Sequence, residues 1–336
     1  MKCERSIFLL LLGFWIGLAG VEPGEARDTE VREAIPVDST ADSRGPAQNS
    51  VPFAELNPNR AISVAGTPAS MSALPVYPAG APVTIASSAM MIDAKSGTVL
   101  FFKNPDIQRP VASTQKLLTA LLIAEHGGLD STVRVAAEDC AVEPTKLGFR
   151  PGETYTKRQL LAAMLVHSCN DAAVCLARND AGSIAAFAGL MNQKAAQLGA
   201  ANSHFVNPNG LPRPGQYSTA RDMARIAFAA YHIPTLREFM RLPGLTFTYS
   251  SGRRRFLEPT NKLVTRSTIF TGMKTGYTDA SGRCLVSSVS AAGNDIILVQ
   301  LGGTHRMLFD DAARLLRWGV ERRESGRDTN LFSNRD

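Results

Sequence analysis

Three short motifs hold the residues of this chain whose types and spacing could do chemistry. They are, in chain order, Ser113-Thr114-Gln115-Lys116, Ser168-Cys169-Asn170 and Lys274-Thr275-Gly276. A serine without a nearby histidine needs another base. A lysine three positions further along a helix lies on the same face, one turn away. The first motif therefore predicts a serine nucleophile with Lys116 as its base, and hence covalent acyl transfer.

The residues before Ser113 predict that its hydroxyl lies at the start of a helix. Pro110 disfavours helix in the residue before it, and a helical pattern follows from Ser113 to Glu125. Backbone N–H groups at a helix start favour negative charge on a reacting oxygen. Lys116 acts as a base only when neutral, which requires burial or a neighbouring cation. Taken alone, the motif also fits a helix-capping serine and an exposed lysine.

The other two motifs offer groups that could face this pair. Ser168 and Asn170 lie between two predicted helices, where a hydroxyl and an amide can point into a cleft, although both are also common helix caps. Lys274 and Thr275 end an apolar strand and could hold a substrate carboxylate. Gly276 would let that strand approach the substrate closely.

A fourth match is a useful contrast. Lys95-Ser96-Gly97 repeats the last pattern, but it precedes Ser113 and falls in a predicted tight turn, so we assign it to the turn alone. The other three motifs are distinguished by their joint occurrence, in this order, each on a suitable element.

Hydrophobic and turn patterns predict an α+β domain. Strands at both ends of the domain enclose a mostly helical middle, so we expect one mostly antiparallel sheet flanked by helices, with a helical subdomain. Predicted strands lie near 89–92, 98–102, 245–249, 269–273, 284–290 and 295–301, and predicted helices near 113–125, 157–166, 170–178, 184–198, 220–231, 234–241 and 306–320.

The ends of the chain differ from this domain. Residues 1–26 resemble a secretory signal peptide, because two basic residues precede an apolar run shorter than the roughly 20 residues of a spanning helix; an uncleaved anchor is the alternative. We predict a flexible Ala/Pro/Ser/Thr-rich linker at 27–82, a catalytic domain at 83–322 and a disordered tail at 323–336. Export leaves four cysteines in an oxidising compartment, and their spacing does not choose a pairing.

Composition excludes several classes of function. The net charge of +6 is mildly basic, without the clustered basic and aromatic residues of a nucleic-acid site. The five histidines are scattered and lack metal-ligand spacing, so we predict neither a metal nor a cofactor. His167, beside the second motif, is interpreted as a packing or supporting residue.

From about Ile85 to Arg322 the chain resembles the D-alanyl-D-alanine carboxypeptidases, serine peptidases among the low-molecular-mass penicillin-binding proteins. The resemblance implies a β-lactamase/transpeptidase-like fold and an exported, periplasmic or extracellular enzyme associated with the cell wall. It extends beyond the three motifs. The similar segments are 91–97, 109–117, 147–153, 204–207, 217–222, 260–263 and 272–278.

The resemblance implies a role for each catalytic residue. Ser113 would attack the peptide bond between the two D-alanines of a peptidoglycan stem peptide, and Lys116 would take its proton. Ser168 and Asn170 would relay protons and orient Lys116. β-Lactams would imitate the substrate and leave Ser113 acylated.

It also implies the substrate-binding residues. Lys274 and Thr275 would bind the terminal carboxylate, beside Gly276. The backbone N–H groups of Ser113 and Tyr277 would form the oxyanion hole.

Two departures from the family pattern stand out. Cys169 occupies a position where glycine is usual, which places a thiol beside the site, where it would alter the pocket or be sensitive to oxidation. The chain also ends soon after the catalytic domain, so we expect no membrane anchor beyond the signal segment.

Three other functions compete with this one. A D,D-endopeptidase of the same family would use the same residues. A β-lactamase would share the motifs, but the E-x-x-x-N loop of class A enzymes is missing around 203–216. A catalytically silent wall-binding homologue would have no reason to keep the nucleophile, base and carboxylate-binding lysine together.

Overall fold

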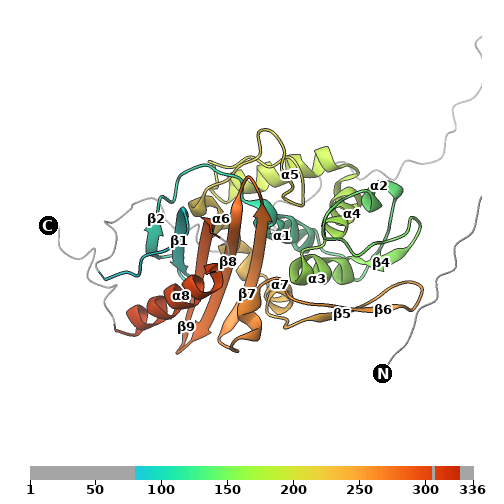
Figure 1. Cartoon of the computed structure of the whole chain (residues 1–336). Helices are drawn as coiled ribbons and strands as arrows, with labels where there is room; N and C mark the ends of the chain where they lie inside the picture. The colour runs from blue at the N-terminus through green and yellow to red at the C-terminus, as the bar shows by residue number, and fades with distance from the viewer. Residues whose placement is uncertain (1–79, 305–306, 326–336) are drawn as a thin grey trace, which may run out of the picture. The chain divides into compact units, whose positions relative to one another are not determined.

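One antiparallel sheet organises the computed structural model, which describes residues 80–304 and 307–325. Its five strands lie in the order β2-β1-β9-β8-β7, so strands from both ends of the domain meet in its middle (Figure 1). The strands are β1 (Ser88–Asp93), β2 (Val99–Lys103), β7 (Phe270–Thr278), β8 (Gly282–Ala291) and β9 (Asn294–Gly303). The predicted α+β class and the antiparallel sheet are confirmed.

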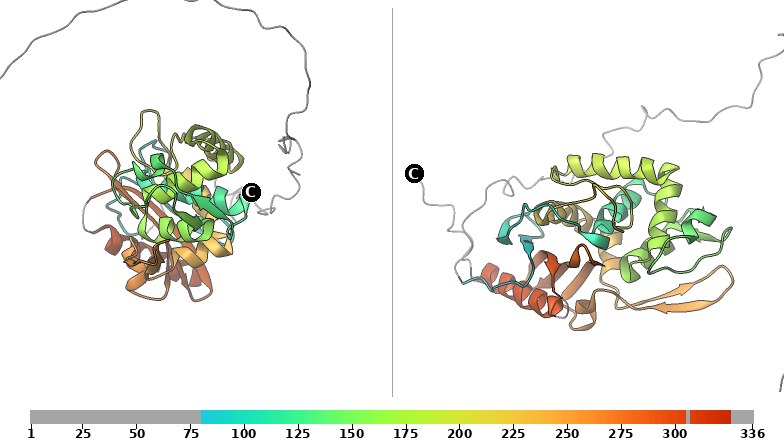
Figure 2. Two further views of the ribbon diagram at one scale, coloured as in Figure 1. Left: turned by 90° about the vertical axis from the view of Figure 1, so that its right-hand side faces the viewer. Right: turned by 45° about the horizontal axis from the view of Figure 1, so that its top comes forward.

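Hydrophobic side chains of the sheet alternate between two cores. In β9, Ile297 and Val299 join the larger core, whereas Ile296 and Leu298 join the smaller one, as the two-residue period of a strand requires. Helix α8 (Leu308–Glu324) covers the smaller core, and the remaining helices gather on the other side of the sheet (Figures 1 and 2).

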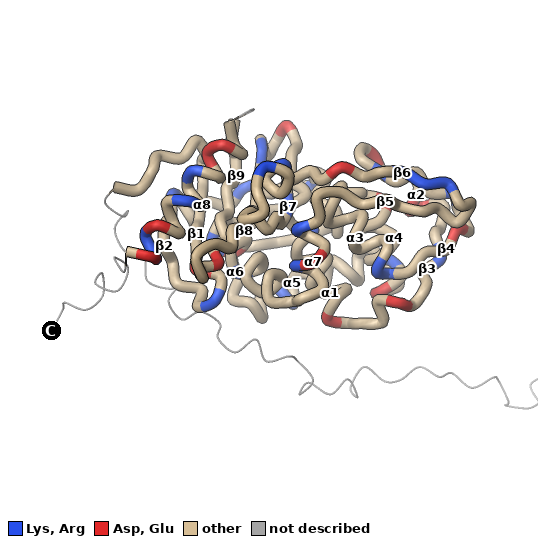
Figure 3. The backbone as a smooth tube through the Cα atoms, turned by 90° about the horizontal axis from the view of Figure 1, so that it is seen from below, with Lys and Arg blue, Asp and Glu red and all other residues tan. Residues whose placement is uncertain are grey.

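The helical part surrounds α1, whose residues are all buried from its first residue to Ile123. Its helices are α1 (Lys116–His126), α2 (Ala137–Cys140), α3 (Lys157–His167), α4 (Asn170–Ala181), α5 (Ile184–Gln197), α6 (Ala220–Tyr231) and α7 (Pro234–Met240). Two small strand pairs complete it. They are β3 (Thr132–Arg134) with β4 (Thr154–Thr156) and β5 (Leu245–Thr248) with β6 (Arg254–Leu257); basic residues run along β6 and its turn (Figure 3).

Several predicted boundaries were wrong, and the physical reason is visible for three of them. Helix α1 begins at Lys116, because residues 112–115 form a 3₁₀ turn, η4. Strand β7 continues through the third motif to Thr278, because β8 pairs with it as far as Gly282. Helix α8 extends to Glu324, since Arg323 near its end pairs with Asp93 at 3.1 Å.

Several predictions lie mostly outside the described residues. The signal segment, the linker up to residue 79 and the tail from 326 are among them, and the domain boundaries stay predictions.

Strands β3, β4 and β6 and helix α2 were not predicted, because three or four residues are too short to show a period.

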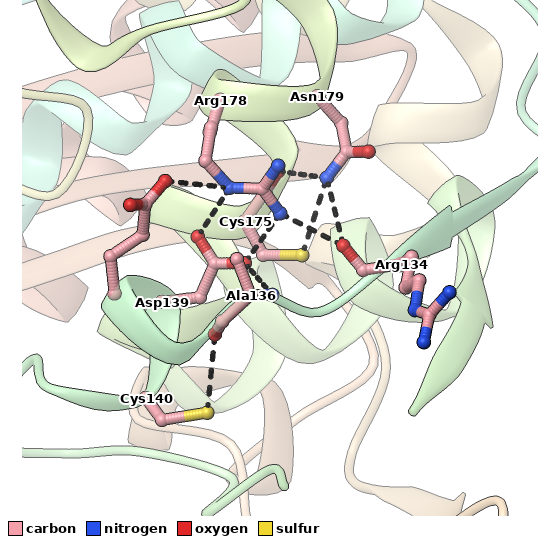
Figure 4. Close-up of polar contacts among 8 residues, drawn as sticks. Arg134, Ala136, Asp139, Cys140, Cys175, Arg178 and Asn179 are labelled. Carbon is pink, nitrogen blue, oxygen red and sulfur yellow. Dashed lines mark hydrogen bonds and ion pairs between the residues drawn. The ribbon is translucent and has the colours of Figure 1, made fainter. Parts of the chain in front are cut away.

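A buried ion pair ties α2 to α4 (Figure 4). The guanidinium of Arg178 donates from Nε and Nη2 to the two carboxylate oxygens of Asp139, at 3.0 and 2.7 Å. Asp139 is fully buried and also accepts the N–H of Ala136 at 2.8 Å. Nη2 of Arg178 reaches the carbonyl of Arg134 at 2.8 Å as well. The pair therefore fixes the start of the segment that leads to residues 141–150.

Replacing Asp139 by alanine should cost roughly 2 kcal/mol of unfolding free energy, because Arg178 would lose two charged hydrogen bonds and keep only the exposed carboxylate of Glu138, at 3.3 Å. Urea denaturation measures this change. Arg158→Ala is the matched control, since its partner Asp130 is exposed, and it should change stability little. Equal effects of the two substitutions would contradict the importance of the buried pair.

Candidate active site

Ser113 lies in the η4 turn, at the point where the chain enters α1. The preceding Ala112 has a left-handed φ of 48°, and Thr114 donates its N–H to the carbonyl of Val111 at 3.3 Å. This tight turn places the Ser113 hydroxyl 2.8 Å from Nζ of Lys116, so the predicted pairing of the two side chains is confirmed.

Lys116 is fully buried and has two further contacts through Nζ. Its ammonium nitrogen lies 2.6 Å from Oδ1 of Asn170 and 2.7 Å from the carbonyl oxygen of Asn209. Burial lowers the pKa of Lys116 well below its ordinary value, and the positive charge of Lys274 lowers it further. The predicted condition for a lysine base, burial beside another cation, is met.

The orientation of Asn170 follows from its own partners. Its side-chain Nδ2 donates to the carbonyl of Pro144 at 2.7 Å, and its backbone N–H donates to the carbonyl of Thr145 at 2.8 Å. Because the amide nitrogen is engaged, Oδ1 is the atom that faces Lys116. Carbonyl oxygens only accept hydrogen bonds, so both N–H groups of a neutral Lys116 would point at Asn170 and Asn209. The nitrogen lone pair would then face Ser113.

Ser168 and Asn170 lie at the junction that was predicted between two helices. Ser168 ends α3 with a left-handed φ of 68°, and Asn170 begins α4. The turn directs both residues to the same site, although the side chain of Ser168 faces the cavity and that of Asn170 lies behind it.

The third motif lies along β7, beside Ser113. Lys274 is fully buried, and its Nζ donates to the carbonyl of Thr275 at 2.8 Å. Burial lowers the pKa of Lys274 to about 7. A Cβ on Gly276 would lie 2.8 Å from the backbone nitrogen of Ser113, so the close approach in the structure is that of β7 to the nucleophile turn.

These residues border one cavity of about 510 Å³. Of the eight predicted site residues, five line it: Ser113, Ser168, Thr275, Gly276 and Tyr277. The other three, Lys116, Asn170 and Lys274, are buried behind this wall. The ring of Tyr277 is exposed, and its hydroxyl donates to Asp279 at 2.8 Å. His167 also lines the cavity, with Nδ1 2.9 Å from the carbonyl of Glu258.

Residues that the sequence did not single out complete the site through their backbones. The carbonyls of Asn209, Pro144 and Thr145 orient Lys116 and Asn170. Every residue has a carbonyl, so no residue type or spacing could have identified these three.

Cys169 differs from the expectation of a reactive thiol. It is fully buried, and burial raises the pKa of the thiol to about 12, so the group stays protonated at neutral pH. A protonated, buried thiol is a poor target for oxidation. Cys140, Cys169, Cys175 and Cys284 are all free.

Within residues 80–304 and 307–325, no three His, Cys, Asp or Glu side chains are grouped so that they could hold a metal ion. The helices of the same two ranges include none that is both long and apolar enough to span a membrane.

A model of the family described as D-alanyl-D-alanine carboxypeptidase matches residues 77–305, more than half of the 336 residues. The chain belongs to this family. The resemblance drawn from the motifs is thereby confirmed.

Relatives with both exo- and endopeptidase names are similar to this chain. The D-alanyl-D-alanine carboxypeptidase DacB2 of Mycobacterium tuberculosis is 34% identical over 253 residues, covering 73% of this chain and 86% of its own. A D-alanyl-D-alanine endopeptidase of Pseudomonas aeruginosa is 34% identical over 263 residues, covering 74% and 82%.

Solved structures of the family share the fold. A D-alanyl-D-alanine carboxypeptidase from Mycobacterium tuberculosis superposes with a TM-score of 0.69 at 33% identity, over 74% of this chain and 96% of that one. A variant of a Streptomyces DD-transpeptidase superposes with a TM-score of 0.67 at 28% identity, over 71% and 99%. The transpeptidase-like α+β fold is confirmed.

In this family member, Gly276→Ala should slow acylation by a fluorescent penicillin at least about tenfold, because the new methyl group would push β7 away from Ser113. Gly189→Ala is the control. It adds a methyl group to α5 where no atom lies within 4 Å, and should leave the rate unchanged. An unchanged rate in Gly276→Ala would contradict the tight packing described above.

Proposed function

We propose that this chain is a serine D-alanyl-D-alanine carboxypeptidase that removes the terminal D-alanine from peptidoglycan stem peptides through an acyl-enzyme. The observation that carries the proposal is the 2.8 Å contact between Ser113 Oγ and Nζ of Lys116. Lys116 is buried, and this burial lowers its pKa. A neutral amine at this distance is a suitable general base for a serine hydroxyl.

The reaction begins with proton transfer from Ser113 to Lys116. The freed oxygen attacks the carbonyl of the penultimate D-alanine, and the oxyanion is stabilised by the backbone N–H groups of Ser113 and Tyr277. Lys116 then gives its proton to the leaving amine, directly or through Ser168. Water then attacks the acyl-enzyme while Lys116, held by Asn170, takes a proton from it and passes it to Ser113 Oγ, which leaves as the hydroxyl and releases the shortened peptide.

We propose that the substrate lies along the free edge of β7. This strand is the last of the sheet, so its outer edge can pair with an extended peptide. Thr275 and Gly276 line the cavity at this edge, beside Ser113. Thr275 would hydrogen-bond the terminal carboxylate. From behind the strand, the positive charge of Lys274 would attract this carboxylate and lower the pKa of Lys116.

A D,D-endopeptidase is the second candidate, because a relative of that name is as similar to this chain as the carboxypeptidase. Both reactions use the same acyl-enzyme. Incubation with a stem pentapeptide and with a cross-linked dimer distinguishes them by mass. The proposed partners are these wall peptides and, as covalent inhibitors, β-lactams. The proposed location is the periplasm or extracellular space.

Intact mass after incubation with benzylpenicillin tests the mechanism. One penicilloyl group should attach to Ser113, and Ser113→Ala or Lys116→Ala should abolish the adduct without unfolding the protein. Lys95→Ala, in the turn that mimics the third motif, should label like the unaltered protein. Labelling of Ser113→Ala would refute the assignment. Rapid antibiotic loss without an adduct would indicate a β-lactamase, and no reaction at all a silent homologue.

The pH dependence of acylation should reflect the lowered pKa of Lys116. Only the neutral amine accepts a proton, so the rate should fall as pH falls through this pKa and reach its plateau well below the ordinary lysine value of about 10.4. Lys274→Gln removes a neighbouring cation, so the midpoint should move to higher pH, whereas Lys95→Gln should not move it. A midpoint that moves down in Lys274→Gln would exclude this coupling.

A further inference from the structure

One acceptor of Lys116, the carbonyl of Asn209, belongs to a segment without helix or strand, residues 206–211. This carbonyl oxygen lies 2.7 Å from Nζ of Lys116 and 3.2 Å from Oγ of Ser113. No hydrogen bond between backbone groups closes residues 206–211, all of which lie in the described part of the chain. The conformation that aims the carbonyl at the amine is therefore held by side chains.

Asn207 closes this segment into a turn with its side-chain amide. Its Oδ1 accepts the N–H of Gly210 at 2.8 Å, and its Nδ2 donates to the carbonyl of Leu211 at 2.9 Å. A side-chain amide offers a donor and an acceptor at one carbon, and this closure uses both. Asn207 is buried, so water does not compete for these contacts. Because Asn209 lies inside the closed turn, the direction of its carbonyl depends on Asn207.

Side chains from the start of the nucleophile helix hold the two preceding carbonyls. Nε2 of Gln115 donates to the carbonyl of Asn207 at 2.6 Å, and Oγ1 of Thr119 donates to that of Pro208 at 2.7 Å. Gln115 and Thr119 are fully buried. The next carbonyl along the segment, that of Asn209, is the one at the reacting amine. Three consecutive carbonyls are thus fixed against the same few residues that carry the base.

The direction of the Asn209 carbonyl decides which side of the amine meets the serine. A neutral Lys116 has two N–H groups, and both are used while Asn170 and Asn209 accept them. An amine that loses the second acceptor can turn an N–H toward Oγ of Ser113 instead. Its lone pair then points away from the hydroxyl proton, and proton transfer waits for the amine to rotate back.

We propose that Asn207 is a positioning residue of the reaction: by closing the turn of residues 207–211 it aims the carbonyl of Asn209 at Lys116 and so directs the lone pair of this base at Ser113. The inference rests on the proposed function and adds a residue that acts without touching the substrate. Asn207 does not line the cavity of Ser113, so its loss should slow the chemical step without weakening binding.

Quenched-flow acylation by benzylpenicillin, read by intact mass over a series of concentrations, separates these two steps. The rates are measured on the alkaline plateau, where Lys116 is neutral, so that a change reports alignment and not ionisation. Asn207→Ala should lower the acylation rate constant about 10- to 100-fold, the range expected when a reacting group is misplaced, and should change the dissociation constant of the non-covalent complex less than about twofold.

Asn192→Ala is the matched control. Asn192 of α5 makes the same pair of contacts to backbone, since its Nδ2 donates to the carbonyl of Phe205 and its Oδ1 accepts the N–H of Phe205, both at 2.8 Å. It holds the chain just before the turn but does not contact residues 206–211. Asn192→Ala should lower the melting temperature about as much as Asn207→Ala and leave the acylation rate constant unchanged.

Three results would overturn the inference. They are an acylation rate constant of Asn207→Ala within about twofold of the unaltered protein, an equal loss in Asn192→Ala, and a loss confined to the dissociation constant. If Asn207→Ala does not fold, Thr119→Val decides. It keeps the side-chain shape but no longer holds the carbonyl of Pro208, so the rate constant should fall about 3- to 10-fold, the effect of one neutral hydrogen bond. An unchanged rate constant would then refute the inference.

The proposed function fails separately. If the unaltered protein forms the penicilloyl adduct on Ser113 but does not release D-alanine from a stem pentapeptide, the carboxypeptidase assignment is refuted, and the acylation rates still decide the inference. If the unaltered protein forms no adduct, Ser113 is not the nucleophile, and both the function and the inference are refuted.

Discussion

The site depends on one amine that is enclosed by oxygen atoms. Nζ of Lys116 is out of contact with water and lies within 2.8 Å of Ser113 Oγ, Asn170 Oδ1 and the Asn209 carbonyl. The oxygens of Asn170 and Asn209 can only accept hydrogen bonds. A neutral lysine therefore donates its two protons to them and directs its lone pair at the serine. Protonation state and direction of proton transfer are therefore set by the same enclosure.

This enclosure brings together segments that are distant in the sequence, and close backbone packing keeps them in place. A Cβ on Gly210 would lie 2.1 Å from the carbonyl oxygen of Ala112, and one on Gly276 would lie 2.8 Å from the nitrogen of Ser113. The η4 turn is thus held between the loop that carries Asn209 and the edge of the sheet. A side chain at either glycine would separate Ser113 from Lys116 and its other neighbours.

The buried groups around Lys116 carry little net charge at neutral pH. Lys116 and Lys274 are both buried, and each positive charge disfavours the other, so the pair does not hold two full charges at neutral pH. The nearby thiol of Cys169 stays neutral, with a pKa raised to about 12, and supplies no compensating anion.

The sequence by itself determined what local spacing controls: Ser113 and Lys116 one turn apart, Ser168 and Asn170 at a helix junction, the alternating strands and most helices. Tertiary structure decided the rest. The acceptor carbonyl of Asn209 and the burial that lowers the pKa of Lys274 to about 7 arise from segments that meet only in the fold. Every residue has a carbonyl, so its position in the sequence does not mark an acceptor. The burial of a side chain depends on all the segments that pack around it, so no short sequence pattern predicts its effect on a pKa.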